Sequence, residues 1–149
     1  MQQKTISPNA IAIIRGSDAY PNLCGQVRFY QRRHLVMVEA DIRGLPNTET
    51  GFFGFHIHAG DSCSGADFAD TGSHYNPATS PHPSHAGDLP PLMYCHGSAY
   101  LAVATSRFHI EDILGRTVVI HSMADDFHSQ PAGNAGTKIA CGVIQKCSG

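Results

Sequence analysis

The stretches QVRFYQ, residues 26–31, and LVMVEADI, residues 35–42, decide the fold class of this sequence. In both, apolar and polar side chains alternate with a period of two, which is the period of a β-strand. We therefore expect one face of each strand to be buried and the other to be in contact with water.

Six more short runs, rich in β-branched and aromatic residues, are separated by Gly, Pro, Asn and Asp. They predict further strands over residues 10–15, 52–58, 89–94, 99–105, 117–122 and 138–144. Residues 109–115 are expected to form one helical turn and no more. Eight short strands with almost no helical period predict an all-β antiparallel sandwich or barrel, formed by residues 1–149 as a single domain.

The composition excludes several classes of protein. The chain has 149 residues, of which 42% are apolar and 15% charged, with a net charge of -2. These values argue against a disordered chain and against a nucleic-acid partner. No apolar run approaches the roughly 18 residues of a membrane span, so no membrane partner is expected.

The beginning of the sequence, MQQKTISPNAIAIIRG, lacks the basic and apolar segments of a secretory signal. As written, it predicts a cytoplasmic protein. A secreted or periplasmic protein stays open if a leader has been removed.

Two long connections interrupt the predicted strands: residues 59–88, called the first loop here, and residues 123–137, called the second loop. Loops of this length in a compact domain are uncommon unless they carry function. Directly before the first loop, GFHIH places His56 and His58 two residues apart on one strand face. Such a pair forms half of a transition-metal site. From these two residues alone, ordinary core or surface histidines are an equal alternative.

The first loop contains the Pro-rich segment HYNPATSPHPSHAGD, which holds three histidines and one aspartate: His74, His82, His85 and Asp88. Three imidazoles and a carboxylate make a complete tetrahedral set for a structural Zn²⁺. The prolines favour this interpretation over a merely polar loop, because they reduce the entropy lost when the ligands gather.

One more histidine, His121, ends the apolar run TVVIH and is followed by Asp125 and Asp126. A strand-end imidazole near a carboxylate pair fits a metal ligand whose orientation is held by outer acids. The five cysteines show no CxxC pair, which argues against a thiolate zinc knuckle and against a thioredoxin-like motif.

The motifs GFHIH, HYNP, HAGD, GRTVVIH followed by ADD, and GNAGTKIACGVI occur in this order over nearly the whole chain. In these segments the sequence resembles the copper/zinc superoxide dismutases, in a bacterial-type or similar variant with a short second loop. The resemblance implies an eight-stranded Greek-key β-barrel or sandwich of the immunoglobulin-like kind with two long functional loops. It also implies copper and zinc as cofactors, superoxide as substrate, and disproportionation to dioxygen and hydrogen peroxide by Cu(II)/Cu(I) cycling.

The resemblance assigns roles position by position. The copper ligands would be His56, His58, His74 and His121, and the zinc ligands His74, His82, His85 and Asp88, so that His74 bridges the metals and delivers a proton to the peroxide. Asp125 would link His56 to His82 from the outer side of the rings. The intrasubunit disulfide would join Cys63 to Cys141, which leaves Cys24, Cys95 and Cys147 without an assigned partner.

The sequence departs from the family pattern at two positions that matter for the substrate. Lys138 stands where most members have an arginine that guides the anion, and lysine keeps the charge without the planar fork. Ala59 replaces a residue that is often acidic. Because the second loop is also short, a dimer interface cannot be copied from other members, and a homodimer stays open.

Two other functions remain as alternatives. One is a non-catalytic relative that binds zinc and buffers or transfers copper, although such relatives often lack copper histidines that this chain retains. The other is a plain β-sandwich interaction module, which would have no reason to build a closed zinc set.

Overall fold

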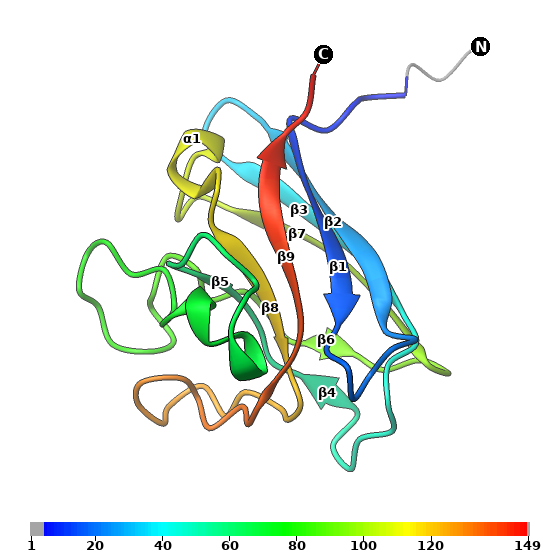
Figure 1. Cartoon of the computed structure of the whole chain (residues 1–149). Coiled ribbons are helices and arrows are strands. Elements are labelled where there is room, and N and C mark those ends of the chain that lie inside the picture. The colour runs from blue at the N-terminus through cyan, green and yellow to red at the C-terminus, as the bar shows by residue number, and fades with distance from the viewer. Residues whose placement is uncertain (1–4, 149) are drawn as a thin grey trace.

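A computed structural model describes residues 5–148 and is built almost entirely from antiparallel strands (Figure 1). The strands are β1 (Ala10–Gly16), β2 (Cys24–Gln31), β3 (Val36–Arg43), β4 (Phe52–Phe53), β5 (Phe55–His58), β6 (Leu92–Met93), β7 (Ser98–Thr105), β8 (Thr117–His121) and β9 (Lys138–Lys146). Two short helices, the 3₁₀ helix η1 (Ala66–Thr71) and α1 (Ile110–Ile113), lie in connections. Within residues 5–148, no helix combines the length and the apolar character needed to cross a membrane.

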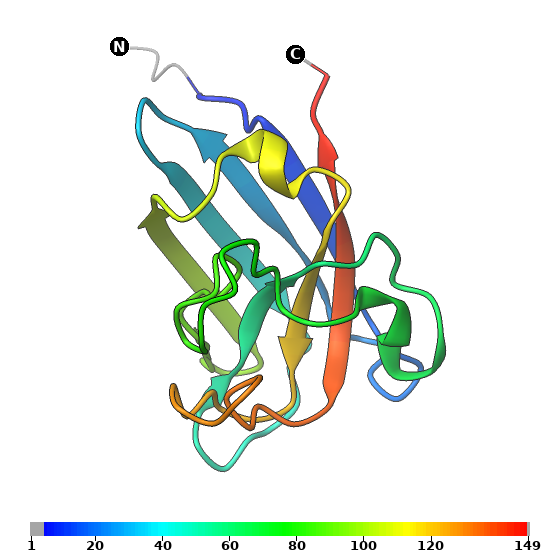
Figure 2. The same cartoon turned by 90° about the vertical axis from the view of Figure 1, so that its left-hand side faces the viewer.

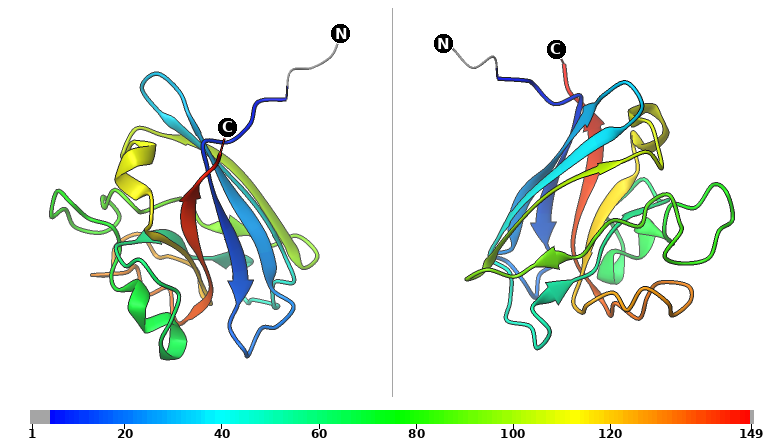
Figure 3. Two further views of the ribbon diagram at one scale, coloured as in Figure 1. Left: turned by 45° about the horizontal axis from the view of Figure 1, so that its top comes forward. Right: turned by 180° about the vertical axis from the view of Figure 1, so that it is seen from behind.

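Seven strands form one curled sheet in the order β5-β8-β9-β1-β2-β3-β7, and β4 pairs with β6 in a small second sheet. The second sheet spans the opening between the two edges of the large one, because β4 runs into β5 and β6 lies beside β7. The chain crosses between the two ends of the sheet after β3, returns after β5 through β6, and crosses again after β7, as in a Greek key. The result is a half-barrel (Figure 3), which agrees with the predicted β-barrel class.

The predicted alternation in β2 and β3 is confirmed. On the inner face Val27 lies opposite Ala40 and Phe29 opposite Val38, and all four are fully buried. On the outer face the ion pair between Arg28 and Glu39, 2.8 Å long, is partly exposed to water. The curled sheet therefore encloses an apolar core on its inner side, as the period of two indicates.

Two predicted strands are shorter than expected. The predicted strand 52–58 is divided at Gly54, whose N–H donates to Met123 O in the second loop, so β4 and β5 belong to different sheets. The predicted strand 89–94 keeps only Leu92–Met93, because Pro90 and Pro91 have no N–H for a ladder. The predicted helical turn at 109–115 is confirmed as α1.

Both long loops lie on the same side of the half-barrel, against β5 and β8, and their segments are adjacent in Figures 1 and 2 (the first loop in green, the second in orange). The first loop is more ordered than its composition indicates, since it contains η1. It also covers the free edge of β5: Tyr75 N–H donates to Ile57 O, and Ile57 N–H donates to Gly87 O, both at 2.8 Å. This pairing removes an open sheet edge and places the loop residues next to the strand residues.

Candidate metal centre

Three of the predicted metal ligands lie on two paired strands. His56 and His58 lie on β5, and His121 ends β8, which pairs with β5 in antiparallel register. The strand β5 is buried on both faces: Phe55 and Ile57 enter the core, while the two histidines lie under the loops. The prediction that His56 and His58 share a face is confirmed.

The remaining predicted ligands come from the first loop. Hydrogen bonds along the edge of β5 bring His74 opposite His58 and Asp88 opposite His56, as isolated antiparallel bridges. His82 and His85 lie on the turn between these two contacts. All seven predicted ligands are thereby gathered into one buried cluster, in which each residue is at most 9% exposed: His56, His58, His74, His82, His85, Asp88 and His121.

One part of the cluster offers four imidazole nitrogens. The ligand atoms of His56, His58, His74 and His121 all lie within 4.8 Å of one another. Nε2 of His58 lies 3.2 Å from Nε2 of His121, and the Nδ1–H of His58 donates to Gly72 O at 2.8 Å. Because Nδ1 carries the proton, the lone pair of His58 Nε2 is directed into the site. Four neutral imidazoles form a donor set suited to Cu(II).

The other part has three imidazoles and one carboxylate. His74 Nδ1 lies 2.8 Å from Asp88 Oδ1 and 3.2 Å from His85 Nδ1. Asp88 Oδ2 lies 3.0 Å from His82 Nδ1 and 3.2 Å from His85 Nδ1. Ligand atoms at about 2.0–2.1 Å from a tetrahedral Zn²⁺ are separated from each other by roughly 3.3 Å. The four side chains therefore fit a zinc ion with little adjustment.

Two buried ring nitrogens indicate that metal ions bind in this cluster. His56 Nδ1 and His74 Nε2 have no hydrogen-bond partner among the described residues. The other nitrogen of each ring already has a partner, Asp125 for His56 and Asp88 for His74. Since an unpaired buried polar atom is costly, the arrangement is explained by an ion that accepts the free lone pairs. The residues fit copper and zinc, with His74 offering one nitrogen to each.

Asp125 of the second loop connects the two parts from outside. Its Oδ2 accepts a hydrogen bond from His56 Nε2 and its Oδ1 accepts one from His82 Nε2, both at 2.7 Å. The neighbouring Asp126 does not join the cluster, because it accepts hydrogen bonds from Ser129 and closes a turn. Gly133 lies directly on the carboxylate of Asp125, and a Cβ at this position would overlap it.

The protonation of the cluster favours metal binding. Burial lowers the pKa of His58 to about 2 and the pKa of His121 to about 3, so both rings are neutral near pH 7. Burial also lowers the pKa of His56 and of His85. For Asp88, burial opposes ionisation, but the hydrogen bond from His74 and the surrounding imidazoles outweigh it, and its pKa is lowered. Neutral imidazoles and an ionised carboxylate are the forms that bind metal.

A pocket of about 390 Å³ leads from the surface to the histidine cluster. His58, His74, His85 and His121 reach its wall, and Lys138 lies there as well. The ammonium of Lys138 donates to Thr71 Oγ1 at 2.7 Å and to Gly72 O at 3.0 Å. Both acceptors are neutral, and within residues 5–148 no carboxylate forms an ion pair with Lys138. The pocket therefore contains an uncompensated positive charge beside the four-imidazole set.

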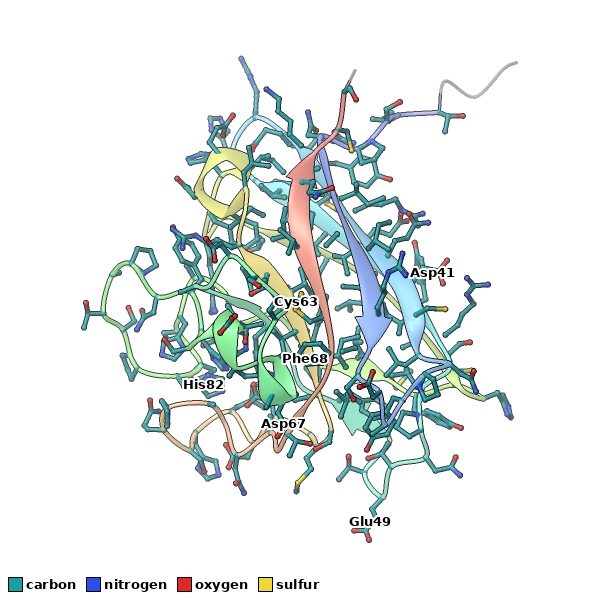
Figure 4. All side chains as sticks on the ribbon, in the orientation of Figure 1. Asp41, Glu49, Cys63, Asp67, Phe68 and His82 are labelled. Atoms are coloured by element: carbon teal, nitrogen blue, oxygen red, sulfur yellow. A yellow bond between two sulfur atoms is a disulfide. The ribbon has the colours of Figure 1, made fainter. Side chains whose placement is uncertain are left out.

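The first loop is bound covalently to the large sheet. Cys63 and Cys141 form a disulfide that links the start of the loop to β9, and Figure 4 shows Cys63 close to the sheet. Cys24, Cys95 and Cys147 are free.

Sequence reasoning missed four side chains that support the cluster: Thr71, Arg107, Arg116 and Gln130. Each acts through a backbone carbonyl or amide of a loop, or through a hydroxyl, and such contacts leave no pattern in a sequence. Arg116 is an example, since it donates to Ala59 O at 3.0 Å and stacks on Tyr75 with its guanidinium carbon 4.2 Å from the ring centre.

Comparison with known proteins agrees with this geometry. A sequence model of the family described as copper/zinc superoxide dismutase (SODC) matches residues 23–144. The chain is 32% identical to a copper/zinc superoxide dismutase of Onchocerca volvulus, over 93% of this chain and 96% of that protein. It is 35% identical to one of Xenopus laevis, over 93% and 97% of the two chains, and 33% identical to one of Aquifex aeolicus, over 81% and 78%.

Proposed function

The chain belongs to the copper/zinc superoxide dismutase family, and on this basis we propose how its own residues serve the reaction. It is a superoxide dismutase that converts two superoxide anions and two protons to dioxygen and hydrogen peroxide. Bound copper supplies the one-electron oxidation and reduction of superoxide, and bound zinc is structural. His56, His58, His74 and His121 hold the copper, and His74, His82, His85 and Asp88 hold the zinc.

One observation supports the role of His74 above the others: its two nitrogens belong to the two different sets. Nδ1 faces Asp88 and His85, while Nε2 is buried among the copper-side rings and has no hydrogen-bond partner within residues 5–148. The ring centre of His74 lies 4.0 Å from that of His56 and 4.9 Å from that of His58. In our proposal, Nε2 would hold either copper or, when released from it, a proton for the peroxide, while the contacts at Nδ1 keep the ring in position.

Lys138 is the residue that would guide the substrate. The chain carries a net charge of -2, which repels an anion weakly, so a local cation has to attract it. A cation in a cleft with a low-dielectric wall can raise the rate of association by about 10 to 10³-fold. Thr71 and Gly72 hold the ammonium at the pocket wall, and Gly72 O also accepts the hydrogen bond from His58. The anion guide and a copper ligand are thus positioned by the same carbonyl.

The function is tested by loading the protein with copper and zinc, measuring the metal content per chain, and assaying superoxide dismutation. We expect one copper and one zinc per chain and a rate that depends on copper. Full loading without dismutation would contradict the catalytic role and would favour a protein that only binds metals.

The guide is tested with Lys138→Met at several salt concentrations. We expect the value of kcat/KM to fall by about 10-fold or more and its dependence on salt to become weaker. Lys138→Arg keeps the charge and should retain most of the rate. Lys146→Met is the matched control, because Lys146 is an exposed lysine at the far end of β9. Equal effects of the Lys138→Met and Lys146→Met changes would contradict the assignment.

A further inference from the structure

The three zinc ligands that serve only zinc lie on a segment without regular secondary structure, residues 82–88. Its own turns provide few backbone hydrogen bonds, such as Ser84 N–H to Pro81 O at 2.8 Å and Asp88 N–H to His85 O at 3.1 Å, and its end is paired with β5, where Ile57 N–H donates to Gly87 O. A segment of this kind loses conformational entropy when its ligands gather around an ion. Contacts that hold it in the binding conformation beforehand reduce this loss.

Arg107, which follows β7, contacts this segment. Its Nη1 donates to three backbone carbonyls: Pro83 O at 2.9 Å, His85 O at 3.1 Å and Asp88 O at 3.2 Å. Two of the three acceptors belong to zinc ligands. Within residues 5–148 no carboxylate forms an ion pair with Arg107, so these carbonyls are the partners of its guanidinium.

Gln130 of the second loop contacts the same segment at His82. Its Oε1 accepts a hydrogen bond from His82 N–H, and its Nε2 donates to His82 O, both at 2.8 Å. The side-chain amide thus pairs with the backbone of His82 as a neighbouring strand would. Figure 4 shows His82, on the first loop, next to the second loop.

Taken together, the backbone of every ligand that serves only zinc is held by a side chain from another part of the chain. Gln130 holds His82, and Arg107 holds His85 and Asp88. The ligands that serve only copper, His56, His58 and His121, need no such support, because they lie in hydrogen-bonded strands. The contacts of Arg107 and Gln130 are therefore directed at one metal site.

We propose that Arg107 and Gln130 are positioning residues that hold residues 82–88 in the zinc-binding conformation and thereby slow the release of zinc. This inference rests on the zinc site of the proposed function. Neither residue contacts the reacting atoms. Their contribution is measured as zinc retention, and copper retention should be nearly independent of them.

The test uses the fully loaded protein and its variants Arg107→Met and Gln130→Met, mixed with an excess of a zinc chelator. Removal of outer partners of metal ligands typically weakens metal binding by 10 to 100-fold, and we expect each variant to release zinc faster by about this factor. The release of copper to a copper chelator should change by less than about 2-fold. The visible spectrum of the protein with Co²⁺ in place of zinc should change as well, since it reports the ligand geometry.

Conservative and matched variants complete the test. Arg107→Lys should recover part of the retention, because all three contacts come from a single nitrogen and an ammonium has three donors. Arg33→Met and Gln145→Met are the controls, since both residues are exposed and neither makes a side-chain hydrogen bond within residues 5–148.

Two results would overturn the proposal: unchanged zinc release in both Met variants, or equal acceleration of zinc and copper release together with a general loss of stability. A loaded wild-type protein that retains zinc but does not dismutate superoxide would contradict the proposed function and leave the role of Arg107 and Gln130 intact.

Discussion

The copper half and the zinc half of the cluster are built on different kinds of backbone. His56 and His58 lie on β5 and His121 lies on β8, so their positions follow from the register of a hydrogen-bonded pair of strands. The ligands that serve only zinc lie on a loop segment whose backbone is held by Arg107 and Gln130. The side chains of His74 and Asp125 connect the two halves.

This difference shows that a strand and a loop hold a metal-ligating residue in position by different means. On a strand, a slip of one residue would turn the side chain to the opposite face, so the fold itself secures the ligand. On a loop, the ligand is secured by side-chain contacts that can be removed one at a time. We expect changes in the copper half to act in an all-or-none manner, and changes around the zinc half to act gradually.

The largest effect is expected for His121→Ala. The change removes a ligand of the copper half alone, and dismutation should fall by more than about 100-fold, beyond what outer partners typically contribute. Zinc content should remain near one per chain, as measured by elemental analysis. The corresponding variant of the zinc half, His85→Ala, should lose zinc and keep copper.

His128→Ala is the control for these two variants, because His128 is exposed and lies outside the cluster. If His121→Ala lost zinc and retained copper, the division of the ligands between the two halves would be wrong.

The difference between the halves also explains how much could be predicted. A period of two places His56 and His58 on one face, and the spacing of His74, His82, His85 and Asp88 indicates a zinc set, so the ligands could be identified from local pattern. The pairing of His56 and His82 through Asp125 came from family resemblance. The contacts of Arg107 and Gln130 could not be predicted, because each joins a side chain to the backbone of a segment distant in sequence.

The same reasoning applies to the fold. The alternation of apolar and polar residues predicted β2 and β3 well, since the polarity of each residue indicates which face of the sheet it lies on. The break at Gly54 depends on a hydrogen bond to Met123, about 70 residues away, and no local signal marks it. The covered edge of β5 depends likewise on the path of the first loop.

The second prediction concerns the disulfide, which anchors the loop that carries the zinc ligands. Cys63 and Cys141 are separated by 78 residues. Closing a loop of this length stabilises the folded state by about 4.5 kcal/mol in the chain-entropy model. Cys63→Ser should reduce the unfolding free energy of the metal-free protein by about this amount in urea, and zinc should be released faster than copper.

Cys95→Ser is the matched control, since Cys95 is exposed and free. Equal losses of zinc and copper in Cys63→Ser would show that the disulfide stabilises the whole fold rather than the loop half.

The third prediction concerns the acid sensitivity that two copper ligands, His58 and His121, give to the metal-free protein. In the metal-free folded protein the pKa of His58 is about 2 and that of His121 about 3, both lowered by burial, whereas an unfolded histidine has a pKa near 6.5. Below that value the unfolded chain binds more protons, so stability falls as the pH falls from about 6.5 toward the folded values. At pH 5.5 each ring should destabilise the folded state by roughly 1 kcal/mol, and the two together by roughly 3 kcal/mol.

Urea unfolding of the metal-free protein at pH 7.5 and pH 5.5 measures this change. The variant His58→Gln removes one of the two groups and should show a smaller decrease between the two pH values. The same decrease in His58→Gln and in the wild type would show that His58 does not contribute to the acid sensitivity.

The smallest effect is expected where the two halves meet. Asp125→Asn keeps the size of the side chain but replaces one acceptor oxygen by an amide that cannot accept the N–H of a ring. Outer partners of this kind contribute 10 to 100-fold to metal affinity. Because His56 is also fixed by its strand and His82 is not, the loss of zinc affinity should exceed the loss of copper affinity. Metal titrations of the variant measure both, and a larger loss for copper would mean that the strand does not secure His56 by itself.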